Sequence, residues 1–295
     1  FVNLIKKLKK NTLILYKFKK NIMHIQNDGT FLIPIDYSKQ SINAIKHSFN
    51  LARYTNSKLH ILYVFAEKQD HSEAELKELA ANTAKESGLS CTCSIIKGDI
   101  YEVTDKYATD KKCTMIVAGL DTHVKFRSFM SRASSSKFIK NAPCPVLTIR
   151  SNTFSPDCKN ILMPFDLSPE SREKVPAVIQ LAKFYGADIR VVSIFDPGES
   201  EYENALLPYL NQVKKYIKEN NVNCTNKSIP GRDVAEAIVD YANKNNCDII
   251  VQMNKRDLSF GEMFSGTMSQ KMVDISNVPV LTINPMERRN MPLSY

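Results

Sequence analysis

Two acidic residues, each followed two positions later by a serine, are the first candidates for chemistry in this sequence. Asp36 and Ser38 follow one short apolar run, and Asp166 and Ser168 follow another. A serine after a strand can begin a helix by accepting a hydrogen bond from its first turn, and a carboxylate is stabilised near the same helix N-terminus. A carboxylate at the end of a strand can equally contact a bound ligand. The pattern leaves both interpretations open.

Motifs of the common enzyme classes are absent from the sequence. It contains no G-x-S-x-G elbow, no G-x-x-x-x-G-K-S/T loop and no H-E-x-x-H pair. The five histidines lack the spacing of metal ligands, and the seven cysteines include no C-x-x-C pair. We therefore predict a protein that is not an enzyme, holds no metal and resides in a reducing cytoplasm.

The two Asp-Ser pairs belong to an internal repeat. Residues 31–65 align without a gap to residues 161–195 at an offset of 130. A second match, at an offset of 134, relates Pro145–Ile149 to Pro279–Ile283, which both read PVLTI. Self-similarity over this length indicates a tandem duplication. The candidate site is therefore one arrangement that occurs twice.

Helix and strand patterns alternate within each repeat. Strands are expected at 59–65 and 189–195 and at 113–118 and 247–252, with helices at about 72–87, 201–219, 100–111 and 233–245. A shorter strand should precede Gly98 or Gly231, and PVLTI reads as a closing strand. Pro176 lies deep inside the first helix of the second repeat, where it should kink the helix or distort its first turns.

The order of elements predicts an α/β fold of two tandem, doubly wound, parallel five-stranded sheets of the Rossmann-like kind. In such sheets ligands collect outside the carboxyl ends of the strands, where the winding direction reverses. The places to search are the ends of strand one, at Asp36 and Asp166, and the ends of strand four, at Gly119 and Met253.

The positive charge is concentrated at one end of the chain. The net charge of the 295 residues is +9, but residues 1–22 contain seven lysines and no acid, so the remainder carries only +2. A nearly neutral body argues against a nucleic-acid groove, and no run approaches the roughly 18 apolar residues of a membrane span. We expect residues 1–22 to be a disordered or non-native extension, with Met23 as the functional start. The alternative is a basic amphipathic helix on an anionic membrane.

The expected divisions are a basic extension at 1–22, a first repeat at 23–152, a second repeat at 157–286 and a C-terminal tail at 287–295. The chain resembles the universal stress protein family, in its tandem two-domain form, over residues 29–150 and 159–286. The resemblance rests on the motif P-x-D-x-S, the order of elements and the two PVLTI endings. It implies an adenine-nucleotide alpha-hydrolase-like fold, a role in the stress response and pairing of the two repeats through their last strands. It is also compatible with a homodimer and with an unknown protein partner.

ATP-binding members of that family carry a phosphate loop after strand four. The loop has a Gly, a second Gly three positions on, and after nine more residues a Gly followed by Ser or Thr. Glycines let backbone N–H groups approach phosphates, and the last pair opens a helix whose N-terminus favours anions. The first repeat places Gly119, Thr122, Arg132 and Ala133 at these positions, so it retains only the first glycine.

The second repeat keeps the other end of the loop. It places Met253, Arg256, Gly266 and Thr267 at the four positions, and Lys255 adds a further positive charge. The final Gly-Thr pair is also typical of a simple helix N-cap. Our leading hypothesis is thus a non-enzymatic stress protein with two degenerate nucleotide-binding-like domains that acts through a partner. The alternative is an ATP-binding, slowly hydrolysing protein that uses the second repeat. The candidate ligand-contacting residues are Asp36, Ser38, Gly119, Asp166, Ser168, Lys255, Arg256, Gly266 and Thr267.

Overall fold

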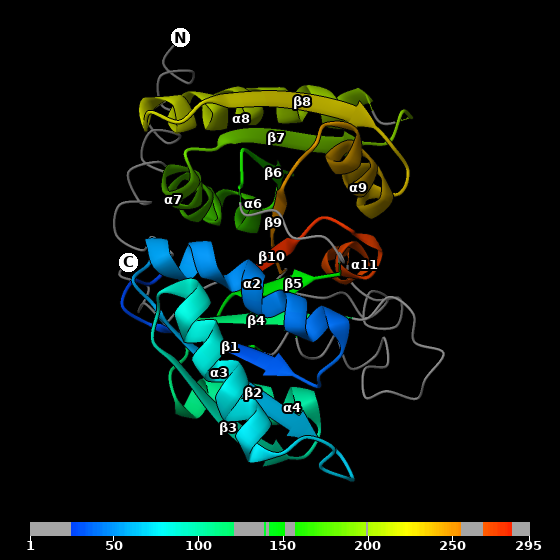
Figure 1. The fold of residues 1–295 in the computed structure, drawn as a ribbon. Helices are drawn as coiled ribbons and strands as arrows, with labels where there is room; N and C mark the ends of the chain where they lie inside the picture. The colour runs from blue at the N-terminus through cyan, green and yellow to red at the C-terminus, as the bar shows by residue number, and fades with distance from the viewer. Residues whose placement is uncertain are drawn as a thin grey trace, which may run out of the picture.

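The two repeats share one continuous sheet. In the computed structural model, which describes residues 25–120, 139, 142–150, 157–198, 200–254 and 268–284, ten strands run in the order β3-β2-β1-β4-β5-β10-β9-β6-β7-β8. Figure 1 shows this sheet from β8 at the top, through β10 and β5 in the middle, to β3 at the bottom. The predicted fold class is confirmed. The two predicted five-stranded sheets join into one through the expected pairing of their last strands.

Each repeat contributes five strands that are parallel to one another. Those of the first repeat are β1 (Thr30–Ile35), β2 (Lys58–Phe65), β3 (Cys91–Lys97), β4 (Met115–Gly119) and β5 (Val146–Ile149). Those of the second are β6 (Asn160–Pro164), β7 (Asp188–Phe195), β8 (Cys224–Pro230), β9 (Ile249–Met253) and β10 (Val280–Ile283). Apolar side chains without alternation fit strands that are covered on both faces.

Helices cover both faces of the sheet. One face carries α2 (Lys39–Tyr54), α3 (Glu73–Ser87), α7 (Val175–Tyr185) and α8 (Ser200–Glu219). The other face carries α4 (Ile100–Asp110), α9 (Val234–Lys244) and α11 (Met268–Ile275). Each buried cluster of side chains takes residues from both repeats, so neither core ends at the boundary between them.

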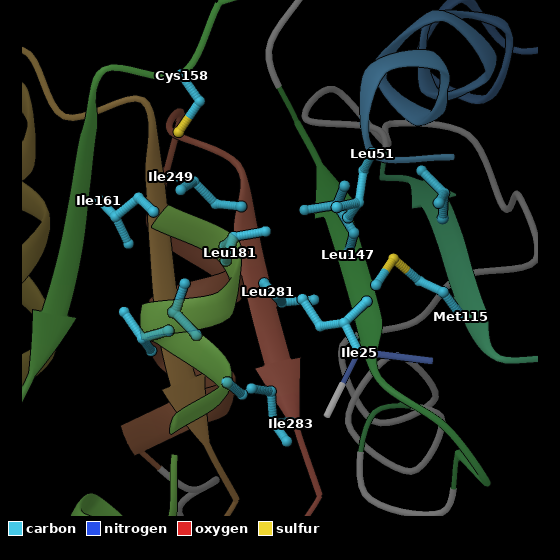
Figure 2. Close-up of a cluster of buried hydrophobic side chains, with 14 of the residues drawn as sticks. Ile25, Leu51, Met115, Leu147, Cys158, Ile161, Leu181, Ile249, Leu281 and Ile283 are labelled. Carbon is cyan, nitrogen blue, oxygen red and sulfur yellow. The ribbon is translucent and has the colours of Figure 1, made fainter. Parts of the chain in front are cut away.

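The junction between the repeats is the pair of PVLTI strands. β5 and β10 are antiparallel, with Leu147 opposite Leu281, and the Thr148 hydroxyl donates to the Val280 carbonyl over 3.1 Å. Figure 2 shows these leucines between Leu51 of α2 and Leu181 of α7, which are equivalent residues of the two repeats. The pairing of the last strands, expected from their repetition, is therefore present within one chain.

A second contact ties the N-terminal side of the first repeat to α7. The Gln180 side chain accepts the backbone N–H of Ile25 over 2.8 Å and donates to its carbonyl over 3.0 Å. Nearby, the ring of Tyr54 stacks on Phe184 with centroids 6.1 Å apart and meets Tyr185 edge to face at 5.3 Å. The two repeats are thus held by side chains as well as by the sheet.

The first helix differs between the repeats. In the first repeat α2 is continuous over 16 residues, whereas the second repeat has the short α6 (Pro169–Glu173), then Lys174, then α7. Pro176 has no N–H to donate, and its ring would collide with the carbonyl four residues before it if one helix continued. Pro176 instead lies in the first turn of α7, a position that suits proline. The predicted disruption at this proline is confirmed.

Candidate functional site

Asp36 lies at the carboxyl end of β1, just before α2, and its side chain is exposed. Its Oδ1 accepts one hydrogen bond that the structure describes, from the backbone N–H of Ser38 over 3.0 Å. Ser38 is the N-cap of α2, and its hydroxyl accepts the N–H of Ser41 over 3.3 Å. The helix is therefore capped by the serine, and the carboxylate orients the residue that caps it. Among the described residues, no hydrogen bond to the second oxygen of Asp36 is seen.

Asp166 occupies the equivalent position at the end of β6 but is half-buried. Its Oδ1 accepts the backbone N–H of Ser168 over 2.9 Å, the Ser168 hydroxyl, and the Ser171 hydroxyl over 2.6 Å. In the first repeat the hydroxyl of the matching serine, Ser41, donates to the Ser38 carbonyl instead, over 3.0 Å. The same Asp-Ser motif thus holds its carboxylate much more firmly in the second repeat.

Lys174 adds a cation beside Asp166. It lies between α6 and α7, only 4% of its surface is exposed, and its charge acts on the Asp166 carboxylate. Burial lowers the pKa of Lys174 to about 8, although the Asp166 charge opposes this change. Burial also raises the pKa of Asp166, but the hydrogen bonds from Ser168 and Ser171 and the Lys174 charge outweigh it, so that this pKa lies below its usual value. Both side chains are therefore mainly charged at neutral pH.

Gly119 ends β4, beside the start of α2. A Cβ at this position would collide with the backbone of Gln40 and Ser41, so the glycine allows the first turn of α2 to press against the strand. This close packing is a structural reason for the residue that requires no ligand. Its counterpart at the end of β9 is Met253, which is buried and forms part of the core.

The remaining loop residues fall outside the part of the chain that the structure describes. These are Thr122, Arg132 and Ala133 in the first repeat and Lys255, Arg256, Gly266 and Thr267 in the second. Residues on either side of the second loop are anchored, since Asn254 donates to the Ile139 carbonyl over 3.1 Å and the Ser269 hydroxyl donates to the Met253 carbonyl over 3.4 Å. The first of these bonds connects the end of β9 to the first repeat.

His60 is far from this edge of the sheet. It is the third residue of β2, and its ring nitrogens lie 2.7 Å from the Thr92 hydroxyl and 2.9 Å from the Tyr107 hydroxyl. Burial, together with the charge of Lys111, lowers its pKa to about 4, so the ring is neutral at physiological pH. His60 is therefore a buried structural histidine and does not supply a base to the candidate site.

Sequence reasoning missed three residues of this site. Ser41 and Ser171 recur at the same place in both repeats, and this repetition was an available signal for their shared role. Lys174 aligns with Ala44, which is fully buried in α2. A lysine aligned with a core alanine was the signal that could have identified it.

The sequence model of the universal stress protein family matches residues 29–150 and again residues 158–284. The chain belongs to the universal stress protein family. A relative in Methanocaldococcus jannaschii is 24% identical over 136 residues, 40% of this chain and 80% of that protein. A family member in Thermus aquaticus is 28% identical over 137 residues, 42% of this chain and 98% of that protein.

Solved structures of the family show the same fold. A universal stress protein from Archaeoglobus fulgidus has a TM-score of 0.69 at 14% identity, with 90% of this chain and 98% of that chain covered. One described as a putative universal stress protein from Pseudomonas aeruginosa has a TM-score of 0.67 at 19% identity, with 88% and 95% covered. Both matches span the two repeats. In the described part of our chain, no helix is long and apolar enough to cross a bilayer.

Proposed function

We propose that this universal stress protein is a cytoplasmic protein that acts without catalysis, through binding to a protein partner in the stress response. The observation that carries the proposal is that the candidate ligand-contacting carboxylate of the second repeat is already hydrogen-bonded within the chain. The Asp166 carboxylate accepts hydrogen bonds from Ser168 and Ser171 of its own repeat, so the group that would contact a ligand is engaged within the chain. The junction of β5 and β10 supports it further, because it makes the two repeats one body.

Two measurements on the purified chain test this proposal. Phosphate release from ATP should not exceed that of a heat-denatured control. Capture with the full chain as bait, from stressed and unstressed cells of the source organism, should retain a protein in a fixed ratio to the bait. ATP turnover that is lost in an Asp36→Asn or an Asp166→Asn variant would contradict the non-catalytic proposal. Assembly of the chain into a homodimer stays a prediction that sedimentation tests.

Nucleotide binding without partner-directed action is the second candidate. The sequence pattern favours ATP in the second repeat. Gly266 and Thr267 would then lie near the phosphates, and Lys255 or Arg256 would supply positive charge. The described residues favour the first repeat instead, because the Asp36 carboxylate is exposed and accepts a single described bond. Mass spectrometry of a denatured extract tests for bound nucleotide. Loss of that nucleotide in Asp36→Asn, and its retention in Asp166→Asn, would assign it to the first repeat.

A further inference from the structure

The outer side of β8 is a free edge of the sheet in the described part of the chain. β8 ends the strand order, and Figure 1 shows it at the top margin of the sheet with α8 beside it. On its inner side, the Gly231 N–H donates to the Phe195 carbonyl of β7 over 2.9 Å, and the Asn223 carbonyl accepts a hydrogen bond from the same strand. Successive peptide groups of a strand point in opposite directions. The backbone N–H groups of Asn226 and Ser228 therefore point away from β7, toward the open side.

A shallow hollow lies on the last turns of α8, beside the start of β8. Its volume is about 470 Å³, and it is lined by Asn211, Lys214, Lys215, Lys218 and Glu219. Two observations connect it to the strand. The Asn226 amide donates to the Asn211 amide oxygen over 3.3 Å, and the charges of Lys214 and Lys218 act on Cys224. The hollow therefore adjoins the free edge.

The hollow carries an excess of positive charge. Lys215 forms an ion pair with Glu219 over 3.8 Å, whereas Lys214 and Lys218 have no acidic partner among the described residues. Lys227 of β8 is exposed, and as the neighbour of a residue that bonds to α8 it lies on the opposite face of the sheet. Cations therefore border the free edge on both faces.

The corresponding edge of the first repeat, formed by β3 beside α3, has a different charge. Cys91 and Cys224 pair with equivalent residues of β2 and β7, which fixes the alignment of the two helices that precede them. The five positions that line the hollow are occupied in α3 by Glu78, Ala81, Asn82, Lys85 and Glu86. One cation and two carboxylates thus stand where the second repeat has three cations and one carboxylate. The positive hollow is a feature of the second repeat and not of the fold.

We propose that this edge binds an extended, acidic segment of the partner protein, which adds to β8 as a further strand. The outward peptide groups supply backbone hydrogen bonds, and Lys214 and Lys218 supply cations for carboxylates of the same segment. A peptide fits both features, whereas a nucleic acid offers negative charge but no row of backbone donors. This binding mode rests on the proposed function in one respect, that the partner is a protein.

The first test locates the binding of a model peptide. The probe is acetyl-EVEVEVE-amide, titrated into the isotope-labelled full chain and followed by NMR. The backbone amide signals of Asn226 and Ser228 should shift, and those of Cys91 and Cys93 on the other edge should not. No binding by the wild-type chain would overturn the proposal, because the lysines would then only protect the edge from other strands.

The second test removes the charge. Lys214→Gln combined with Lys218→Gln should weaken binding of the peptide about fivefold, since two exposed ion pairs are lost. The matched control is Lys85→Gln combined with Lys106→Gln, which removes the same charge from exposed positions of the first repeat and should leave the affinity unchanged. Equal weakening in the two double variants would refute a local site, since only the net charge of the chain would then matter.

The third test removes the backbone donors of the peptide. The same peptide N-methylated at every residue keeps its carboxylates but has no N–H groups, so it should bind about tenfold more weakly. Equal binding of the two peptides would overturn strand addition, as would equal displacement of the peptide by an oligothymidylate of the same charge.

Partner capture separates this binding mode from the proposed function. The full chain and its Lys214→Gln, Lys218→Gln variant serve as baits. Equal recovery of a partner by both would refute binding at this edge and leave the proposed function standing. Recovery of no partner by either bait would remove the proposed function, and the peptide titrations would still decide whether the edge binds acidic strands.

Discussion

The first helices of the two repeats show how one ancestral arrangement has been packed in two ways. In the first repeat, α2 is continuous and presses against Gly119, where no side chain can be added without a collision with its backbone. In the second, Met253 fills the end of the strand and the helix is divided at Lys174. The loss of a glycine from the phosphate-loop pattern is therefore accompanied by a change in the neighbouring helix. Features that resemble a lost binding motif are also part of how each repeat packs.

The largest effect is expected at Gly119. Gly119→Ala adds a Cβ against the backbone of Gln40 and Ser41, so α2 must shift or the strand must bend, at a cost of about 3 kcal/mol. The midpoint of urea unfolding measures this loss. Gly198→Ala is the control, because the nearest atom to its Cβ would be a side-chain oxygen 3.5 Å away. If the two variants unfold at the same urea concentration, the tight packing of α2 is not what requires Gly119.

Acid should weaken the first repeat at His60, a position that Arg190 occupies in the second repeat. Because the folded protein keeps His60 neutral with a pKa of about 4, while an unfolded histidine titrates near pH 6.5, protons favour unfolding. The stability from neutral His60 is complete above pH 6.5 and is lost as the pH falls toward 4, by about 3 kcal/mol. His60→Gln should remove this loss. The difference in unfolding free energy between wild type and variant, measured from pH 8 to pH 4, checks it, and a difference that does not vary with pH would contradict it.

Asp105 should have the opposite pH dependence. Its Oδ1 is buried without a hydrogen-bond partner among the described residues, and burial raises its pKa to about 7. The folded chain therefore holds a proton that the unfolded chain has released, and stability from this group falls as the pH rises through 7. Asp105→Val, which copies Val239 of the second repeat, should stabilise the chain by about 1 kcal/mol at pH 8 and less at pH 5. Thermal unfolding at both pH values tests this, and equal changes at the two would refute the role of ionisation.

The smallest effects compare the two serine caps. Ser38→Ala should cost about 1 kcal/mol, because α2 loses its N-cap. Ser168→Ala should in addition raise the pKa of Asp166, because that carboxylate loses a hydroxyl donor. Unfolding curves and carboxyl NMR titrations of the two variants measure these effects. An unchanged pKa of Asp166 in Ser168→Ala would show that the Ser168 hydroxyl does not stabilise this carboxylate.

The parts of the fold that the sequence predicts are those that depend on local pattern and repetition. The PVLTI strands, the alternation of elements and the break at Pro176 each follow from residue types whose preferences do not need a partner. The burial of Lys174 could not be predicted in the same way, because this residue lies at the break between α6 and α7, where the two helices bring it into the interior. The sequence likewise left Asp36 and Asp166 open between a helix cap and a ligand contact, because both repeats carry the same P-x-D-x-S motif. The aspartate is exposed in the first repeat and hydrogen-bonded to serine hydroxyls in the second. Only the surrounding packing determines which of these two environments it has.

The antiparallel pair of β5 and β10 has an evolutionary consequence. In a symmetric dimer every substitution appears on both sides of the axis, so each must be tolerated twice. Joining the halves in one chain removes that restriction. Gln180, whose side-chain amide forms two hydrogen bonds with the backbone of Ile25, for example aligns with a different residue, Asn50, in the other half. The halves also meet regardless of dilution, because the linker keeps their effective concentration high. The two halves could therefore diverge, and the equivalent carboxylates now differ, with Asp36 exposed and Asp166 half-buried.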